Sequence, residues 1–319
     1  YFHISDQEKQ KVYEFRKYMW SNGYAIDLPD EALYRYLVTS NYRMPPALSK
    51  VLKMVNWRKA NRIDTLLQDM YIRQLTSILS RKLRFIEHGH DLLQRPLTIM
   101  AIGSFRLCDI LKEYEIEDIL MVFYYYTEYI ERKCMHISRQ LNRDYTGNVT
   151  LMDMEGLSLC THLHPKAIAI FKTLVLSNTY YYPESCHRVY VVNSPPIFSF
   201  FWKLIYPLMN EMQYSKMHMI NNLDELLNDF SPDQLPCHYG GNCQCEAEKI
   251  LFGDMDAAPT TPSGVLKVPK NGLATMTQAV NEGDHVVISF SSLESDVFYT
   301  AFSKNRDCVH YYCQKRLAA

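Results

Sequence analysis

The sequence lacks the patterns that identify several large protein classes. Its 11 glycines form no G-x-G-x-x-G and no G-x-x-x-x-G-K-[S/T] motif, so nothing indicates a loop that cradles nucleotide phosphates. The formal net charge is -1, without the basic excess that accompanies nucleic-acid binding. The most apolar helical stretch is shorter than the ~18 residues of a membrane span, and it contains Lys203 and Pro207. The sequence therefore gives no indication of nucleotide binding, nucleic-acid binding or a membrane span.

The nine cysteines give no disulfide framework. They are scattered, odd in number and follow no secretory signal, which predicts free thiols in a reducing, cytosolic environment. Hydrophobic residues make up 47% of the 319 residues and charged residues 22%, a balance typical of a globular protein with a substantial core. A chain of this length has room for two or three domains.

The most distinctive stretch is YYYPESCHRVYVVNSPPIFSFFWKLIYPLM at 180–209, which predicts a short strand that breaks at a double proline into an aromatic helix. At helical spacing its apolar side chains form two neighbouring rows, Ile197, Phe201, Leu204 and Leu208 in one and Phe198, Trp202, Ile205 and Met209 in the other. A surface helix normally buries a single stripe a little over 100° wide. This helix therefore needs two apolar partners. One is the protein core, and the other is either a further part of the core or a hydrophobic ligand that is not always present.

The first part of the chain predicts helices. Residues 1–62 read as a small helical module, in which Ser5 and Glu8 match a capping box at the start of the first helix. Pro45 and its neighbour open a third helix. Residues 63–94 continue with helical and connecting segments.

The middle of the chain changes to an α/β pattern. A strand-like stretch at 95–103 precedes a long helix at 115–142. A strand at 148–157, a helix at 165–178 and a strand at 187–193 follow with short connections. Strand, helix and strand in this order form a βαβ unit, which implies parallel pairing.

The last part predicts one more strand, at 215–220, and two short helices that open at Asn222 and Ser231. Residues 246–272 are rich in proline, glycine, threonine and alanine and are interpreted as a linker. Residues 273–319 contain the alternating stretches GDHVVISFSS and DVFYTAFS, which predict strands of an all-β segment. Because two strands alone make no stable sheet, we interpret this segment as incomplete.

Two carboxylates in the middle of the chain are the first candidates for chemistry. Asp153 and Glu155 lie two residues apart on the predicted strand, so their side chains would share a face, as in an acid–base pair. No recognisable nucleophile motif lies beside them, and Gly156 indicates that the strand is ending. We interpret the pair as structural hydrogen-bonding groups and keep a soluble α/β enzyme as an alternative.

Two groups of residues carry metal-ligand side chains. His162 and His164 flank one leucine at a helix start, where we expect them to serve as polar groups of that start because no third ligand is in sight. Four soft ligands lie within a short segment, at Cys237, His238, Cys243 and Cys245. They lack the two separated ligand pairs of a closed zinc site. We therefore predict no metal site and interpret the thiols as packing groups of a loop.

Several motifs together resemble the CRAL-TRIO (Sec-fourteen-like) lipid-transfer family. They are YPE at 182–184, the strand that ends near a proline, the aromatic helix, SKM at 215–217 and PDQLPCHYGG at 232–241. The phrase MDMEGLSLCTHLHPKAI at 152–168 is similar to the animal branch that includes supernatant protein factor and the tocopherol-associated proteins. The tail GDHVVISFSSLESDVFYTAF is similar to the opening of a GOLD domain, which follows CRAL-TRIO in that branch.

The resemblance implies an α/β fold: the helical module at 1–62, a CRAL-TRIO domain at 63–245 with a mixed β-sheet as its floor, the linker, and a partial GOLD-like segment at 273–319. It also implies that the aromatic helix is a lid over a hydrophobic pocket lined by Phe198, Phe201, Trp202, Leu204, Ile205 and Leu208.

The resemblance also points to a headgroup site. In family members that bind phosphatidylinositol, a glutamate and a lysine hold the headgroup together with basic residues, and Glu184 and Lys216 match the first two. Ser185 stands where an arginine is expected, and Val38 and Ser40 stand at two further basic positions. Phosphoinositide binding is therefore left open, beside a tocopherol-like or sterol-like ligand.

The function implied is that of a lipid-transfer protein that holds one hydrophobic lipid under a mobile lid and exchanges it with membranes. Such a protein needs no catalytic residue, no metal and no cofactor other than the bound lipid, and it has no nucleic-acid partner. We expect it in the cytoplasm, in peripheral and reversible contact with membranes. The alternative of another class is a lipid-responsive adaptor that senses a lipid and binds a protein partner, for example through the C-terminal β segment, with little net transfer.

Overall fold

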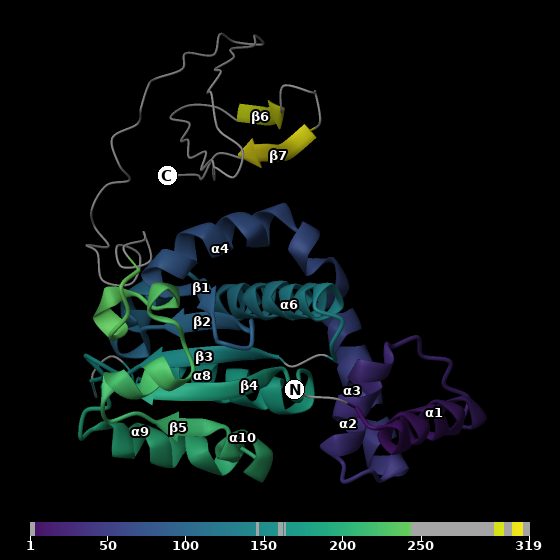
Figure 1. Ribbon diagram of the computed structural model, residues 1–319. Coiled ribbons are helices and arrows are strands. Elements are labelled where there is room, and N and C mark those ends of the chain that lie inside the picture. The colour runs from purple at the N-terminus through teal and green to yellow at the C-terminus, as the bar shows by residue number, and fades with distance from the viewer. Residues whose placement is uncertain are drawn as a thin grey trace. The chain divides into compact units, whose positions relative to one another are not determined.

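Three helices form the N-terminal part of the protein (Figure 1). The computed structural model describes residues 4–144, 147–158, 162 and 164–243, together with the backbone of two strands at 297–302 and 308–314. The helices are α1 (Asp6–Ser21), α2 (Asp30–Val38) and α3 (Met44–Ala60). They share a core of their own that includes Val12, Phe15, Met19, Leu33, Leu37 and Val51. The predicted capping box at the start of α1 is present, with Ser5 and Glu8 each accepting from the other's backbone.

A short connection leads from these helices into the sheet. It contains a 3₁₀ turn η1 (Ile63–Gln68), the helix α4 (Met70–Lys82) and the strand β1 (Phe85–His90). The sequence predicted helical and connecting segments here and missed β1. This strand has no clean alternation of apolar and polar residues, and it contains Gly89 at a positive φ of 64°.

The five strands of the first unit form one mixed sheet in the order β1-β2-β3-β4-β5. The further strands are β2 (Pro96–Met100), β3 (Asn148–Asp153), β4 (Cys186–Val192) and β5 (Met217–Met219). β1 pairs with β2 antiparallel, and the other neighbours pair in parallel. The parallel pairing predicted for the βαβ unit is therefore confirmed, and the sheet is mixed as the resemblance implied.

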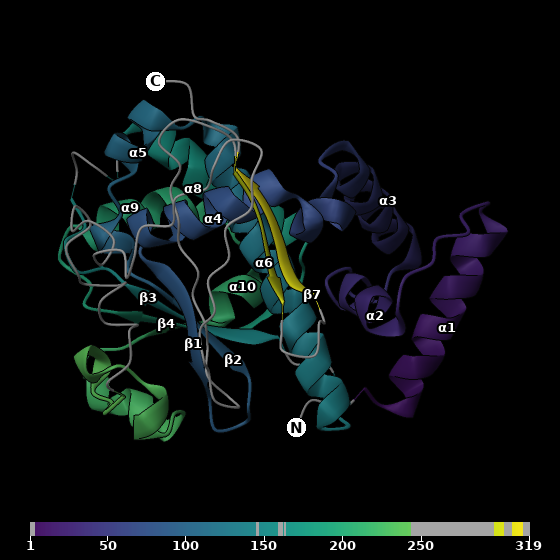
Figure 2. The same ribbon diagram turned by 90° about the horizontal axis from the view of Figure 1, so that it is seen from above.

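Helices cover one face of this sheet, as Figure 2 shows for α4, α8 and α9. They are α5 (Leu107–Glu113), α6 (Ile116–Gln140), α8 (Pro165–Tyr180) and α9 (Phe198–Ile205), in addition to α4. The turns η2 (Ile102–Ser104) and η3 (Tyr206–Leu208) and the short helix α10 (Glu211–Ser215) complete this layer. Their apolar side chains and those of β4 form the largest core cluster, which includes Leu79, Phe105, Ile119, Ile170, Val191 and Phe201.

The segment after β5 covers the opposite face of the sheet. It folds into three 3₁₀ turns, η4 (Leu223–Asn228), η5 (Pro232–Gln234) and η6 (Cys237–Tyr239). Two of these begin at the caps predicted for short helices. Leu226, Phe230, Leu235 and Tyr239 pack on the apolar side chains that β2, β3 and β4 direct to this side.

The chain divides into two units, residues 1–255 and 256–319. In the second unit the structure describes an antiparallel pair, β6 (Val297–Phe302) and β7 (Cys308–Gln314). β6 falls within the predicted stretch DVFYTAFS. The predicted linker at 246–272 and the stretch GDHVVISFSS lie outside the described residues.

No helix in the described part of the chain is both long enough and apolar enough to cross a bilayer.

Candidate functional site

The helix α9 packs on the helix-covered face of the sheet, directly after β4. The chain turns at Asn193, which has a positive φ of 52°, and the amide of Phe198 donates to the carbonyl of Pro195 at 2.8 Å. Phe201 meets Phe171 of α8 edge to face, with ring centroids 5.2 Å apart. The helix is therefore packed on α8 and on the core cluster of this face.

The six residues predicted to line a lipid pocket differ in their surroundings. Phe198, Phe201 and Ile205 are buried in the core cluster. Trp202 is partly buried against the same cluster, and its ring stacks on that of Phe198 at 5.7 Å. Leu208 is half-buried, whereas Leu204 is exposed.

The outer side of α9 is also apolar. Phe200 is 59% exposed and Leu204 is 37% exposed, and Lys203 lies between them in the sequence. Leu204 and Phe201 belong to the same predicted apolar row, but Phe201 is buried and Leu204 is exposed. One face of the helix is thus packed on protein, while apolar side chains of the other face meet solvent.

Glu184 and Lys216, the two residues predicted to hold a headgroup, form an ion pair with 2.8 Å between Lys216 Nζ and Glu184 Oε2. Glu184 follows α8 and Lys216 precedes β5, so the two parallel strands β4 and β5 bring their starts together. Lys216 also donates to the carbonyl of Cys186 at 2.8 Å. Both side chains are partly exposed, Glu184 to 22% and Lys216 to 20%, so a ligand from solvent can reach them.

The three positions at which a basic residue was expected supply no charge. Ser185 lies next to Glu184 at the start of β4 and is half-buried. Val38 packs against the core of the N-terminal helices, and Ser40 is buried there with no hydrogen-bond partner for its hydroxyl. Arg35, three positions before Val38 on α2, pairs with Glu131 of α6 at 3.0 Å.

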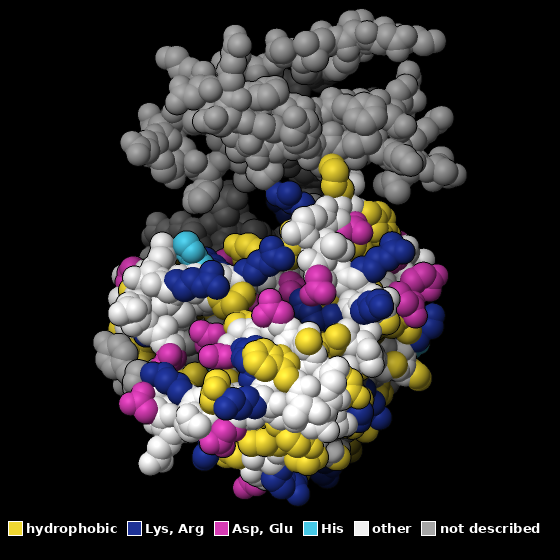
Figure 3. Space-filling view, turned by 90° about the vertical axis from the view of Figure 1, so that its right-hand side faces the viewer, with side chains coloured by type: hydrophobic (Ala, Val, Ile, Leu, Met, Phe, Trp, Pro, Cys, Tyr) yellow, Lys and Arg dark blue, Asp and Glu magenta, His cyan; other side chains and the backbone are white. Residues whose placement is uncertain are grey.

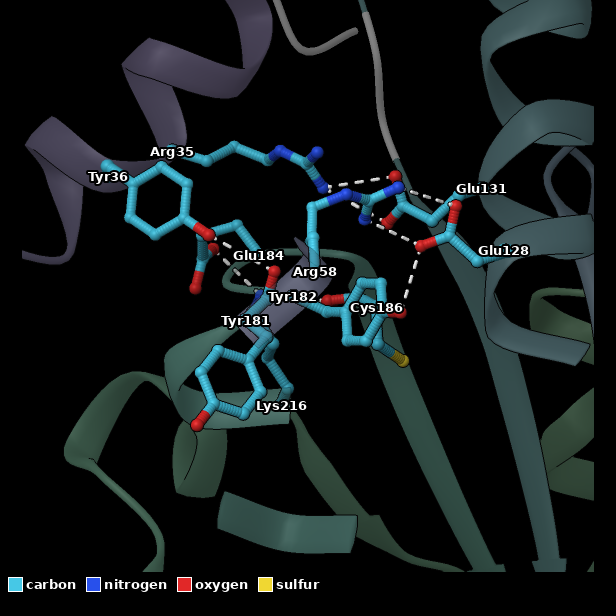
Figure 4. Close-up of polar contacts among 10 residues, drawn as sticks. All are labelled: Arg35, Tyr36, Arg58, Glu128, Glu131, Tyr181, Tyr182, Glu184, Cys186 and Lys216. Atoms are coloured by element: carbon cyan, nitrogen blue, oxygen red, sulfur yellow. Dashed lines mark hydrogen bonds and ion pairs between the residues drawn. The ribbon is translucent and has the colours of Figure 1, made fainter. Parts of the chain in front are cut away.

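A network of buried polar groups lies near Glu184 and Lys216 (Figure 4). Arg58 of α3 donates to both carboxylate oxygens of Glu128 of α6, at 2.7 and 3.1 Å. The hydroxyl of Tyr182 donates to the same carboxylate at 2.9 Å. Burial raises the pKa of Tyr182, and the carboxylate of Glu128 raises it further, so the hydroxyl keeps its proton. No local sequence pattern predicts this network, since its members lie up to 124 positions apart.

The structure corrects the geometry expected for Asp153 and Glu155. β3 ends at Asp153, so Glu155 lies in the following turn and the two side chains do not share a strand face. Asp153 is buried and accepts from the amide of Glu155, from Asn193 Nδ2 at 3.0 Å and from the Tyr239 hydroxyl at 3.0 Å. This carboxylate ties the ends of β3 and β4 to the last turn of the domain, which is the structural role that was expected.

The two histidines near the start of α8 serve local structure. His162 is buried, and its Nε2 contacts the carbonyl of Ile102 at 2.9 Å while its Nδ1 accepts from the amide of Ser158. Burial lowers the pKa of His162. His164 caps α8, with its Nδ1 accepting from the amide of Lys166. Both agree with the interpretation as polar groups of a helix start.

The described residues of the Cys237–Cys243 segment do not form one cluster of metal ligands. Cys237 Sγ donates to the carbonyl of Cys243 at 3.6 Å, whereas His238 Nε2 lies 3.4 Å from Glu155 Oε2. Cys245 lies outside the described residues. His238 therefore joins Asp153 and Glu155, with ligand atoms within 4.8 Å of one another, instead of the cysteines. Three hydrogen bonds engage Asp153, one of the three members of this group.

The described part of the chain has a mixed sheet with helices on one face, the aromatic helix α9 after β4, and three helices before the sheet. Residues 80–241 match the model of the CRAL/TRIO domain family, and the chain belongs to this family. It is 27% identical over 249 residues to the Sec14 cytosolic factor of Schizosaccharomyces pombe, which covers 76% of this chain and 85% of that relative.

Two further comparisons agree with this family. The chain is 27% identical over 254 residues to the phosphatidylinositol/phosphatidylcholine transfer protein SFH14 of Arabidopsis thaliana, covering 77% of this chain but 43% of that relative. The crystal structure of Sfh5 superposes with a TM-score of 0.57 at 15% identity, over 76% of this chain and 90% of that chain. At this identity the superposition establishes the fold alone.

Proposed function

We propose that this protein binds one phospholipid, phosphatidylinositol or phosphatidylcholine, under α9 and transfers it between membranes. One observation carries the proposal: within a CRAL/TRIO domain, α9 buries Phe198, Phe201 and Ile205 and leaves Phe200 and Leu204 in solvent. A helix of this kind is stable when closed on the core and finds a second apolar partner when it opens at a bilayer.

Such a transfer of lipid between membranes requires no energy source. A two-chain phospholipid has about 30 methylene groups, and burial contributes ~0.8 kcal/mol for each, of order 25 kcal/mol in all. The bilayer offers the lipid nearly the same free energy, so the difference between the two states is small. The rate of exchange is then set by the opening of α9, and no catalytic residue takes part.

For the polar end of the lipid we propose the pair of Glu184 and Lys216. The carboxylate of Glu184 would accept hydrogen bonds from hydroxyl groups of the headgroup, and the ammonium group of Lys216 would donate a hydrogen bond to a phosphate oxygen. Charge-assisted hydrogen bonds contribute ~1.5 to 3 kcal/mol each. Because Ser185, Val38 and Ser40 add no cation, we expect weaker discrimination for phosphatidylinositol than a site with further cations would give.

A transfer assay tests the function. Donor vesicles with a labelled phospholipid are mixed with unlabelled acceptor vesicles, and the label in the acceptors is followed with and without protein. We expect a rate that rises in proportion to protein concentration for at least one of the two phospholipids. A rate equal to the spontaneous exchange for both, with folded protein, contradicts the proposal.

We further propose the division of the chain into a helical module at 1–62, a lipid domain at 63–245, a linker at 246–272 and a GOLD-like segment at 273–319. The separate core of α1, α2 and α3 supports the first boundary, and the antiparallel pair of β6 and β7 supports an all-β tail. A GOLD-like tail would place the chain in the animal branch. We expect a cytoplasmic protein in reversible contact with membranes.

A second candidate function is that of a lipid-responsive adaptor. Its supporting observation is the outer face of the helix α1, where Tyr13 and Trp20 are more than half exposed. Tyr24, just beyond the end of α1, is exposed as well. Figure 3 shows the side of the first unit with the N-terminal helices, where hydrophobic side chains lie between lysines and arginines. Tryptophan and tyrosine dominate the binding energy of protein interfaces. An adaptor would bind lipid with little net transfer, so the assay above distinguishes the two functions.

A further inference from the structure

We propose that Tyr36 and Arg58 of the N-terminal helices are positioning residues for the headgroup site, because they anchor the Tyr181–Tyr182 segment that fixes the backbone of Glu184. The inference rests on the proposed function and deepens it. The N-terminal helices would thereby determine how well the protein recognises the headgroup, and they would act through Tyr181 and Tyr182.

The backbone of Glu184 is the feature that needs an anchor. Its φ is 57°, in the left-handed region that favours glycine and that other residues seldom adopt. Such a conformation persists only where the surrounding structure determines it on both sides. If either side is loosened, Glu184 can relax to negative φ, which swings its carboxylate away from Lys216.

The first anchor on the preceding side is a chain of hydrogen bonds through Tyr182. Arg58 holds the carboxylate of Glu128 with two hydrogen bonds, and this carboxylate accepts from the Tyr182 hydroxyl (Figure 4). Asp64 accepts from Arg58 Nε at 2.7 Å and so fixes the guanidinium group from its other side. These bonds hold the buried ring of Tyr182, two residues before Glu184.

The second anchor holds the neighbouring residue, Tyr181. The Tyr36 hydroxyl of α2 donates to the backbone carbonyl of Tyr181 at 3.1 Å. The ring of Trp57 of α3 stacks on the ring of Tyr181, with centroids 4.1 Å apart and an interplanar angle of 7°. The N-terminal helices thus hold this segment by main chain and side chain, at two consecutive residues.

The sheet holds the following side. The carbonyl of Ser185 accepts from the amide of Asn148, the first residue of β3, at 3.1 Å. The approach is close: a Cβ on Gly147 would lie 2.4 Å from this carbonyl oxygen. Glu184 therefore lies between one segment attached to the sheet and another attached to the N-terminal helices. The second attachment is the one that Tyr36 and Arg58 control.

Two substitutions test this inference with little disturbance of packing. Tyr182→Phe removes one hydroxyl and leaves Arg58 and Glu128 paired, and Tyr36→Phe removes the hydrogen bond to Tyr181. Tyr34→Phe is the matched control, since the Tyr34 hydroxyl donates to Glu8 inside the N-terminal helices. The readout is the ratio of phosphatidylinositol transfer to phosphatidylcholine transfer between vesicles, together with the thermal midpoint.

We expect the double variant Tyr36→Phe/Tyr182→Phe to lower this ratio about three- to tenfold, as the loss of one hydrogen bond to a carbonyl and one to a carboxylate permits. Phosphatidylcholine transfer should stay within twofold, and Tyr34→Phe should change neither rate. In a Glu184→Gln background the double variant should not lower the ratio further, because the two changes act through one group.

Three results would overturn the inference. An equal loss of both transfer rates means that the segment only supports the fold. An unchanged ratio, with normal transfer by the unsubstituted protein, means that the anchors do not act on Glu184 and leaves the proposed function intact. If the unsubstituted protein transfers neither lipid, the proposed function fails and the inference fails with it.

Discussion

Lys216 Nζ and Glu184 Oε2 lie 2.8 Å apart although 32 positions separate the two residues in the chain. The parallel pairing of β4 and β5 places both at the same edge of the sheet. In this arrangement the two charges neutralise each other while no ligand is bound. An incoming headgroup must offer each of them a comparable partner, which favours a group with both hydroxyls and a phosphate.

The first prediction concerns the ammonium group. Lys216→Met should reduce phosphatidylinositol transfer about tenfold or more, because a charge-assisted hydrogen bond contributes ~1.5 to 3 kcal/mol and 1.4 kcal/mol is a factor of ten. Lys82→Met is the matched control, since it removes an ion pair with Glu113 on α4 and α5. Vesicle transfer rates measure both. Equal rates for Lys216→Met and the control would remove Lys216 from the site.

The second prediction separates the two sides of α9. Leu204→Asp adds a charge on the exposed side, so the thermal midpoint should stay within a few degrees while lipid extraction from vesicles falls severalfold. Phe201→Ala removes a buried ring and should destabilise the closed helix by about 3 kcal/mol or more. Unchanged extraction by Leu204→Asp would show that the outer side of α9 does not meet the membrane.

The third prediction concerns stability. Arg58→Ala leaves the buried carboxylate of Glu128 without its charged partner and should lower the free energy of unfolding by about 3 to 5 kcal/mol. The double variant Arg58→Met/Glu128→Leu should lose less, since it leaves no unpaired charge. Lys82→Ala, at an exposed pair, should lose at most about 1 kcal/mol. Denaturant unfolding decides, and a loss as small as that of Lys82→Ala would contradict the role of Arg58.

The fourth prediction is a pH dependence. Burial, with Arg95 and Arg188 nearby, lowers the pKa of His187 to about 4 from its ordinary value of 6.5. Between these values the unfolded chain binds the proton and the folded chain does not, so the free energy of unfolding falls as the pH decreases from about 6.5 to about 4.

This pKa difference corresponds to at most about 3 kcal/mol of unfolding free energy. Because His187 is only partly buried, solvent screening makes the actual contribution smaller than this bound. His187→Gln should flatten the pH dependence of unfolding in this window. A variant with the same slope as the unsubstituted protein would show that His187 does not set it.

The sequence predicted the elements whose signals are local. The capping box of Ser5 and Glu8 is present, and the long apolar periodicity predicted α6 within two residues at its ends. The sequence around Asp153 predicted a strand that continues to residue 157. In the structure β3 ends at Asp153, whose carboxylate accepts hydrogen bonds from Asn193 and Tyr239. The pattern of apolar residues cannot predict where β3 ends, because that depends on tertiary hydrogen bonds.

The candidate site was predictable only where a motif contained it. Glu184 and Lys216 come from two short motifs, and the structure places them together. The left-handed backbone of Glu184 and the pairing of Arg58 with Glu128 had no local signal, because each depends on segments that meet only in the fold. The exposure of Leu204 depends on which way α9 turns as it packs, which a helical wheel with two apolar rows leaves open.

The central claim is that this protein carries one phospholipid under α9. Native mass spectrometry of protein purified without detergent, followed by lipid extraction, tests it most directly. We predict one phospholipid for each chain, with phosphatidylinositol or phosphatidylcholine as its headgroup class. Protein that is folded but empty, and that stays empty after incubation with vesicles of both lipids, would contradict the claim.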